Sequence, residues 1–211
     1  MQRLRITYTV SGALRYASNL DQNRVWERAA RRAGLPLAYS GGFNPRPRIQ
    51  IAAALPVSFM AEAEWVDLWL LRSVELQVAL EALTTTLPQG LRILGAEEVD
   101  LTEPPLPARL QAAVYTVEVE AVIPAAEVHR RVEELLAADS LPRTRRGRAY
   151  DLRPLVERLW VEAEGANELA LGMALSAQEG ATGRPEEVLD ALGLGGGFYR
   201  VRRQRLLLRP E

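Results

Sequence analysis

The stretch LPLAYSGGFNPRPRIQIAAALP, residues 35–56, decides the fold prediction because it joins the end of a predicted helix to a predicted strand. Gly41 and Gly42 permit positive φ and a close approach of the backbone to a ligand. Pro45 and Pro47 fix their own φ and favour extended geometry in the residue before each of them. We therefore expect the loop between the helix and the strand to be stiff despite its glycines.

A stiff loop held by a scaffold is a common place for binding residues. The side chains that this loop presents are Tyr39, Phe43, Asn44, Arg46 and Arg48. Its aromatic rings can stack on nucleic-acid bases, or they can pack in the core, which is the commoner fate of aromatic residues. The loop is thus either a binding surface or a tight connection whose polar groups satisfy its own backbone.

Hydrophobic patterning around the loop predicts a β-α-β-β-α-β unit, which is the ferredoxin-like order. The first strand alternates apolar and polar side chains and is expected to be half-buried. The helix after it begins at Ser18 or Asn19, carries Asp21 in its first turn, and ends before Gly34. The predicted elements are strand 3–10, an extended lead 13–18, helix 19–33, strands 49–55 and 61–71, helix 75–87 and strand 91–99.

The second half of the chain predicts a second unit of the same kind. A proline-rich stretch near residue 104 is typical of a linker, which gives an N-terminal unit 1–101, a linker 102–110 and a C-terminal unit 111–211. The fold prediction is α+β, with two tandem ferredoxin-like units packed together. The predicted elements are strand 113–122, helix 124–138, a hairpin in 141–153 around Arg146-Gly147, strands 156–164 and 169–176 joined at 165–167, helix 184–192 and strand 199–208.

Composition excludes several classes of chemistry. The 211 residues contain neither cysteine nor lysine, and His129 is the only histidine. This removes disulfides, thiolate nucleophiles, cysteine-ligated metal clusters and lysine Schiff bases. His129 has no obvious acidic partner in the sequence, and Glu62, Glu64 and Asp67 are interpreted as a solvated edge rather than a metal site. No catalytic residue, cofactor or metal is assigned.

The sequence also lacks a run of eighteen apolar residues and an apolar leader at its N-terminus, which predicts a cytoplasmic protein without a membrane partner. Its net charge of −1 conceals an uneven distribution. Residues 1–50 hold nine arginines against two acids, a net charge of +7, whereas residues 51–140 hold five arginines against fifteen acids, a net charge of −10. A basic N-terminal quarter favours a local anionic partner.

The densest basic cluster lies in the predicted hairpin. A hairpin of this kind projects several guanidinium groups from one edge, which suits a phosphate or an RNA backbone. The alternative is a solvated tip whose charges protect a sheet edge from aggregation. The candidate binding residues here are Arg143, Arg145, Arg146, Arg148 and Arg153.

Four stretches of the sequence match a known pattern: LRYASNLD at 14–21, RAARRAGLPLAYSGGFNP at 28–45, DLRP at 151–154 and, in support, RPEEV at 184–188. Together they resemble the radical SAM-linked family of bacterial proteins, the domain of unknown function 2344. The resemblance implies a radical S-adenosylmethionine protein encoded nearby as partner, which would carry the iron–sulfur cluster that this cysteine-free sequence cannot hold. It also implies RNA or the ribosome as a second partner, since family members neighbour ribonuclease and ribosomal-protein genes.

The sequence departs from the family pattern at two positions where the family usually has histidine. Asn19 stands in the Ser-Asn-Leu-Asp stretch, and Arg46 stands between two prolines. Neither side chain shuttles protons near neutral pH, whereas both can hydrogen-bond a ligand. The joint loss is natural if the two histidines form one paired site, and it favours binding over catalysis.

We therefore expect a non-catalytic accessory protein that binds a radical SAM enzyme, its RNA or ribosomal substrate, or both. The first binding surface is expected to combine Asn19, Asp21 and the loop residues, and the second is the arginine-rich hairpin. The alternative is a metal-independent RNA endonuclease resembling CRISPR repeat-processing proteins. That alternative needs His129 as its base and residues 195–197 as a glycine-rich loop.

Overall fold

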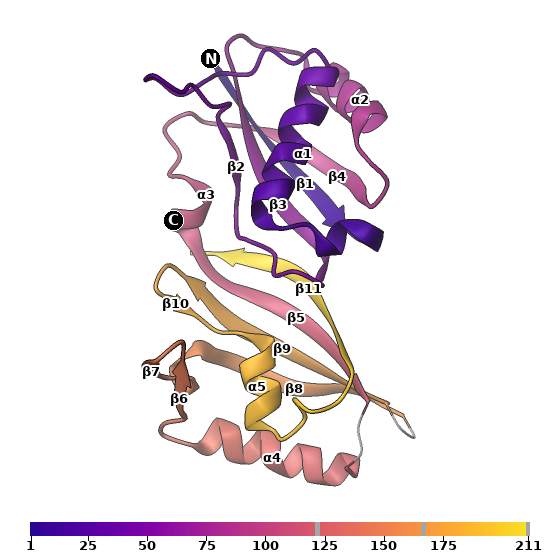
Figure 1. The fold of residues 1–211 in the computed structure, drawn as a ribbon, viewed down its shortest axis with the longest axis vertical. Coiled ribbons are helices and arrows are strands. Elements are labelled where there is room, and N and C mark those ends of the chain that lie inside the picture. Colours follow the sequence, from indigo (N-terminus) through magenta and orange to yellow (C-terminus); the bar gives the residue numbers. More distant parts are fainter. Residues whose placement is uncertain (121–122, 166–167, 210–211) are drawn as a thin grey trace. The chain divides into compact units, whose positions relative to one another are not determined.

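A computed structural model describes residues 1–120, 123–165 and 168–209. The protein is α+β and divides into two compact units, Met1–Arg109 and Leu110–Glu211 (Figure 1). Two predicted features lie partly outside the described residues: the end of strand 113–122 and the turn at 165–167. None of the described helices is long and apolar enough to cross a membrane.

Unit 1 is built on a four-stranded antiparallel sheet in the order β2-β3-β1-β4. Its elements appear in the predicted order, with a 3-10 helix η1 (Gly12–Tyr16) where an extended lead was expected. The second strand is shorter than predicted and ends at Ile51. The bounds are β1 Gln2–Val10, α1 Asn19–Arg32, β2 Ile49–Ile51, β3 Met60–Leu70, α2 Leu76–Thr86, β4 Leu91–Val99 and α3 Leu106–Arg109.

Strand β1 is buried on both faces, which corrects the prediction of a half-buried strand. Its apolar residues are in the core, and Arg3 and Arg5, expected on a solvated face, are only 1% and 6% exposed. The carboxylate of Asp67 on β3, itself fully buried, compensates both charges, because β1 and β3 pair antiparallel with Arg5 opposite Asp67.

Helix α1 follows its sequence signals closely. The hydroxyl of Ser18 accepts a hydrogen bond from the backbone N–H of Asp21, and Gly34 adopts φ +68° directly after the helix. Trp26 and its neighbouring alanines enter the core, whereas Leu20 in the first turn is 57% exposed. The helix packs beside α2, where the Thr86 hydroxyl donates to the carbonyl of Ala29.

Unit 2 repeats this plan with an added hairpin. Its antiparallel sheet has the order β10-β9-β5-β11, and β8 also pairs with β9. The small β6–β7 sheet is inserted between α4 and β8 (Figure 1). The bounds are β5 Leu110–Glu120, α4 Ala125–Ala137, β6 Pro142–Arg145, β7 Arg148–Asp151, η2 Arg153–Leu155, β8 Val156–Glu164, β9 Glu168–Gln178, β10 Ala181–Thr182, α5 Pro185–Ala191 and β11 Tyr199–Leu208.

Candidate nucleic-acid interface

The glycine–proline loop of unit 1 is closed by its own hydrogen bonds. The backbone N–H of Ser40 donates to the carbonyl of Arg46 at 2.8 Å, and the N–H of Arg46 donates back to the Ser40 hydroxyl at 3.0 Å. The N–H of Arg48 donates to the carbonyl of Ala38 at 2.8 Å. These bonds leave Phe43 fully exposed at the tip, next to the exposed side chain of Asn44.

Two of the loop's candidate residues are partly engaged within the protein. The Arg48 guanidinium lies over the ring of Trp69 at 5.0 Å, and the Arg3 guanidinium also lies 4.9 Å from the centroid of that ring. The Tyr39 hydroxyl accepts a hydrogen bond from Arg31 at 3.1 Å, and Tyr39 remains 42% exposed. The aromatic residues of the loop are therefore at the surface rather than in the core.

Asn19 and Asp21 do not share a surface with this loop. They lie in the first turn of α1, after β1 has ended, whereas Ala38 in the loop bonds to Trp69 beside the start of β1. The length of β1 separates these ends of the sheet by about 27 Å. The hydroxyl of Ser18 and then the charge of Arg24 lower the pKa of Asp21, so this carboxylate serves the helix start. Asn19 and Arg46 accordingly do not form one paired site.

The β6–β7 hairpin places its arginines on one face. Arg146 and Gly147 adopt φ of +48° and +76°, as a two-residue type I′ turn requires, which confirms the predicted hairpin. Arg143 pairs with Tyr150, and Arg145 pairs with Arg148. Because alternate residues of a strand point to the same side, these four side chains share one face of the hairpin.

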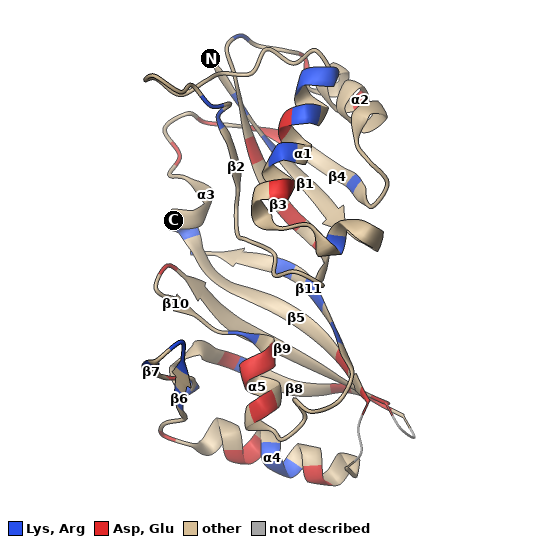
Figure 2. Ribbon diagram, viewed as in Figure 1, with Lys and Arg blue, Asp and Glu red and all other residues tan. Residues whose placement is uncertain are grey.

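This hairpin forms a hollow of about 480 Å³ together with the residue that precedes α5. Its lining residues, which we call the basic hollow, are Arg145, Arg146, Arg148, Tyr150 and Arg184. In the described part of the chain, no ion pair within 4.0 Å joins any of these arginines to a carboxylate. Figure 2 shows the basic hairpin and the acidic helix α5, and Glu187 and Asp190 of that helix line a further hollow with Arg143 of the hairpin. The arrangement can hold an anion with charge-assisted hydrogen bonds.

Tyr150 stays a neutral hydrogen-bonding group in this hollow. Burial, and then the nearby carboxylate of Glu187, raise the pKa of Tyr150 to about 12. Arg153, also predicted as a binding residue, is used structurally: its guanidinium donates to the carbonyls of Leu136 and Val156. Arg184 also lines the hollow but was not predicted. It lies more than thirty residues after the hairpin, and no pattern in the sequence indicates that the two are in contact.

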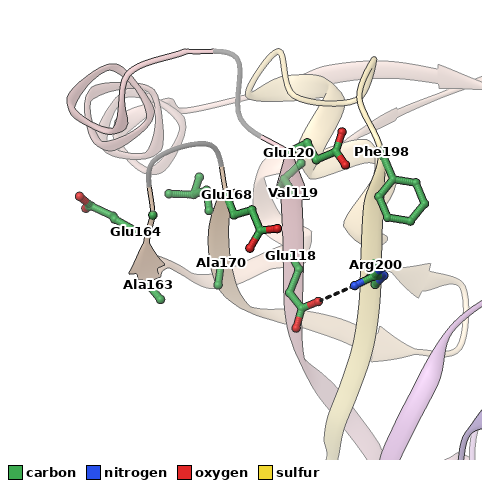
Figure 3. A pocket seen from close by; sticks show the side chains of 11 residues that line it. Glu118, Val119, Glu120, Ala163, Glu164, Glu168, Ala170, Phe198 and Arg200 are labelled. Carbon is green, nitrogen blue, oxygen red and sulfur yellow. Dashed lines mark ion pairs between the residues drawn. The ribbon is translucent and has the colours of Figure 1, made fainter.

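A second hollow of unit 2, about 330 Å³ in volume, has the opposite charge (Figure 3). Glu118, Glu120 and Glu168 line it, and Arg200 lies 3.9 Å from Glu118. Glu164 also lines it but points away from these three carboxylates in Figure 3. The carboxylates that line this hollow repel phosphate, so the hollow is unsuited to nucleic acid. The described residues contain no group of three or more side chains arranged to hold a metal ion.

The structure corrects two predictions, one about His129 and one about the acidic residues on β3. His129 has an acidic partner after all: its Nε2 lies 2.5 Å from Oε1 of Glu164, and both side chains are about half exposed. Of the three acids on β3 that were expected at a solvated edge, Glu62 is exposed, whereas Glu64 is 1% exposed and Asp67 is fully buried against Arg3 and Arg5.

The fold and the basic hollow define an α+β protein with a surface suited to anionic partners. The family model described as "Uncharacterized protein conserved in bacteria (DUF2344)" matches residues 3–185, and the chain belongs to this family. Among curated proteins, no relative matches this chain.

Two solved structures contain a chain with a similar fold. A chain in the crystal structure of a Cbf5-Nop10-Gar1 complex matches 96% of this chain with 11% identity and a TM-score of 0.55. A chain in an H/ACA RNP bound to a substrate RNA containing 2′-deoxyuridine matches 96% with 9% identity and a TM-score of 0.51. This chain spans 48% and 47% of those chains, about half of their length. At identities this low, the match is evidence of a similar fold and of nothing more.

Proposed function

We propose that this protein is an RNA-binding accessory protein, without catalytic activity of its own, that works with a radical SAM enzyme. The observation that carries the proposal is the basic hollow, in which four arginines lack a carboxylate partner among the described residues. Unpaired guanidinium groups on a rigid hairpin are available for phosphate, and phosphate contacts supply most of the affinity of RNA-binding proteins.

The architecture supports this proposal. We propose that both units are ferredoxin-like, since β4-β1-β3-β2 in unit 1 and β11-β5-β9-β8 in unit 2 follow the same order of strands. One of the chains with a similar fold belongs to a complex described as an H/ACA RNP bound to a substrate RNA. An RNA-related role for the present chain is consistent with that setting.

The partner enzyme is proposed from the family and from the chemistry that this sequence lacks. A radical SAM cluster is held by cysteine thiolates, and these 211 residues contain none. The exposed loop tip with Phe43, Asn44 and Arg46 is the surface proposed for the partner, since an exposed aromatic ring beside polar groups is typical of interface anchors.

RNA binding is tested by fluorescence anisotropy with a labelled single-stranded RNA at two salt concentrations. We expect binding that weakens with salt and falls roughly tenfold or more in the double variant Arg145→Gln with Arg148→Gln. The matched control is Arg200→Gln, which removes one such charge beside the acidic hollow. RNA binding that is absent, or equal in all three proteins, would refute the proposal.

The partner is tested by purifying the tagged protein from its own cells and identifying the proteins that come with it. We expect a radical SAM protein that is lost in the variant Phe43→Ser with Arg46→Ala and retained in Arg72→Ala, an exposed arginine beyond β3. The double variant leaves the loop's backbone hydrogen bonds in place. Failure to recover a radical SAM protein with the unaltered chain contradicts this part of the proposal.

One observation favours RNA cleavage as a second candidate function. A histidine whose ring is held by a carboxylate can act as a general base, and the Nε2 of His129 lies 2.5 Å from Glu164. Metal-independent cleavage of labelled RNA that disappears in His129→Ala would establish this function. Intact RNA after incubation with the unaltered protein eliminates it.

A further inference from the structure

The arginines of the basic hollow come from different elements and line one hollow together. Arg145 comes from β6, Arg148 from β7, Arg146 from the turn between them, and Arg184 from the residue before α5. An RNA backbone carries its charges in a row, one on each phosphodiester. Four guanidinium groups around one hollow are better matched to a single group with more than one charge.

The charge of the hollow points to a phosphate monoester. A phosphodiester carries one negative charge, whereas a terminal phosphate carries about −1.5 to −2 at neutral pH and offers three acceptor oxygens. The planar guanidinium group binds such oxygens in pairs. No described carboxylate forms an ion pair with these arginines, and the nearby Glu187 acts on Tyr150, so the guanidinium groups remain available to a doubly charged ligand.

A neighbouring hollow has room for the rest of a nucleotide. It measures about 440 Å³ and shares Arg145, Tyr150 and Arg184 with the basic hollow. Its remaining walls are mostly small or apolar: Leu155, Gly180, Ala181 and Thr182, with Asp151 as the one carboxylate. Two backbone N–H groups, of Leu141 and Arg153, already hold that carboxylate and lower its pKa. A ribose and a base can therefore lie beside Tyr150.

We propose that the basic hollow binds the terminal phosphate monoester of an RNA strand and that the neighbouring hollow holds the nucleotide carrying it. This rests on the proposed RNA-binding function and makes it more specific. The protein then recognises an RNA end, such as the end that a nuclease leaves, rather than any internal stretch.

The test compares one oligoribonucleotide sequence in three forms: with a 5′-phosphate, with a 3′-phosphate, and with hydroxyl groups at both ends. We expect one phosphorylated form to bind roughly tenfold or more tightly than the unphosphorylated form, because the terminal phosphate adds charge-assisted hydrogen bonds to the arginines. The preference should disappear in Arg148→Gln with Arg184→Gln and persist in Arg200→Gln. Arg148→Lys, which keeps the charge but loses paired hydrogen bonding, should keep only part of it.

Two results overturn this inference. Equal binding of all three oligomers, still weakened by the double substitution, rejects the terminal phosphate and leaves the proposed RNA binding intact. Competition by a free nucleoside monophosphate at the concentration of the oligomer would assign the hollow to a small nucleotide instead of an RNA end. No binding of any oligomer refutes the proposed function itself, so the two failures are distinguishable. The melting temperature of each variant reports whether it is folded.

Discussion

Two sets of arginines in this protein serve opposite purposes. Arg3 and Arg5 on β1 are buried, and both donate to the carboxylate of Asp67, at distances of 2.5 to 3.2 Å. The arginines of the basic hollow lie at the surface or half-buried, without an ion pair to a described carboxylate. Arginine therefore has two roles in this protein: it stabilises the sheet in unit 1, and it remains available for a ligand in unit 2.

The difference shows that charge counted along the sequence misleads. The +7 of residues 1–50 predicts an anionic partner for the N-terminal quarter, yet Asp67 compensates part of it. Within the same quarter, Arg31 pairs with Glu27 and Arg24 with Asp21. What counts for binding is the charge left unpaired after the sheets have formed, and in unit 2 that charge gathers at the hairpin.

The largest effect is expected from removing the carboxylate that the buried arginines share. Asp67→Asn leaves two buried guanidinium groups poorly compensated, since the Glu103 carboxylate lies 3.5 Å from Arg5 and is itself bound by Arg109 at 2.8 Å. In the unaltered protein burial opposes the charge of Arg5, whereas its hydrogen bond to Asp67 raises its pKa. Arginine does not lose its proton in proteins, so the variant cannot relieve the uncompensated charge in that way. We expect a loss of about 3 to 5 kcal/mol in the free energy of unfolding, measured by urea denaturation.

The control for this substitution is Glu97→Gln. Glu97 also lies near Arg5, at 3.9 Å, but its side chain is 67% exposed, so its loss should cost less than about 0.5 kcal/mol. Tryptophan fluorescence is a suitable probe, because Trp26, Trp65 and Trp69 all belong to unit 1. Equal costs for the two substitutions would mean that burial does not distinguish the two sets of arginines.

The second effect concerns the unpaired arginines. Arg145→Gln with Arg148→Gln should leave the free energy of unfolding within about 0.5 kcal/mol, because no ion pair is broken. The same change should lower the slope of log affinity for RNA against log salt concentration by about 1.4, or ~0.7 for each of the two phosphate charges that the variant no longer neutralises on a single strand. A large loss of stability with an unchanged salt slope would place these arginines in the structural set.

Local signals in the sequence predicted most of the fold. Ser18 as a cap, Gly34 after α1 and the Arg146-Gly147 turn each act within a few residues, and each is found as predicted. The failures are of two kinds. Local geometry was missed at η1, and strand β1 was expected to be half-buried because its alternation gives no sign of a buried carboxylate on β3.

The candidate site was less predictable for the same physical reason. The hairpin arginines are close in sequence, so their shared face follows from the period of a strand. Arg184 reaches the hollow only through the tertiary fold, and Arg153, although close to the hairpin in sequence, is consumed by carbonyl groups. Asn19 and Arg46 deviate together from a family pattern, yet Asn19 lies near the end of strand β1 and the loop that holds Arg46 lies near its start.

A smaller effect is expected at the turn that presents the basic hollow. Gly147 has φ +76°, so Gly147→Ala forces a side chain into the left-handed region at a cost of about 1 kcal/mol. Amide hydrogen exchange of the hairpin measures this cost as a lower free energy of local opening. The matched control is Gly196→Ala, whose Cβ would meet no atom within 4 Å and whose φ is not positive. Similar exchange in both variants would argue against a type I′ turn.

The smallest effect distinguishes a third set of arginines, which are exposed but paired. On α4, hydrogen bonds from Arg130 and then Arg131 lower the pKa of Glu127 from 4.5 to about 2. Because the folded pKa is depressed, the stabilisation is present above the unfolded value and is lost as the pH falls from about 4.5 to about 2. Glu127→Gln should therefore be less stable than the unaltered protein at pH 7, and the two should converge near pH 2. Thermal melts across this range measure the convergence. A difference that persists at the acid end of the range would mean that Glu127 acts through packing rather than charge.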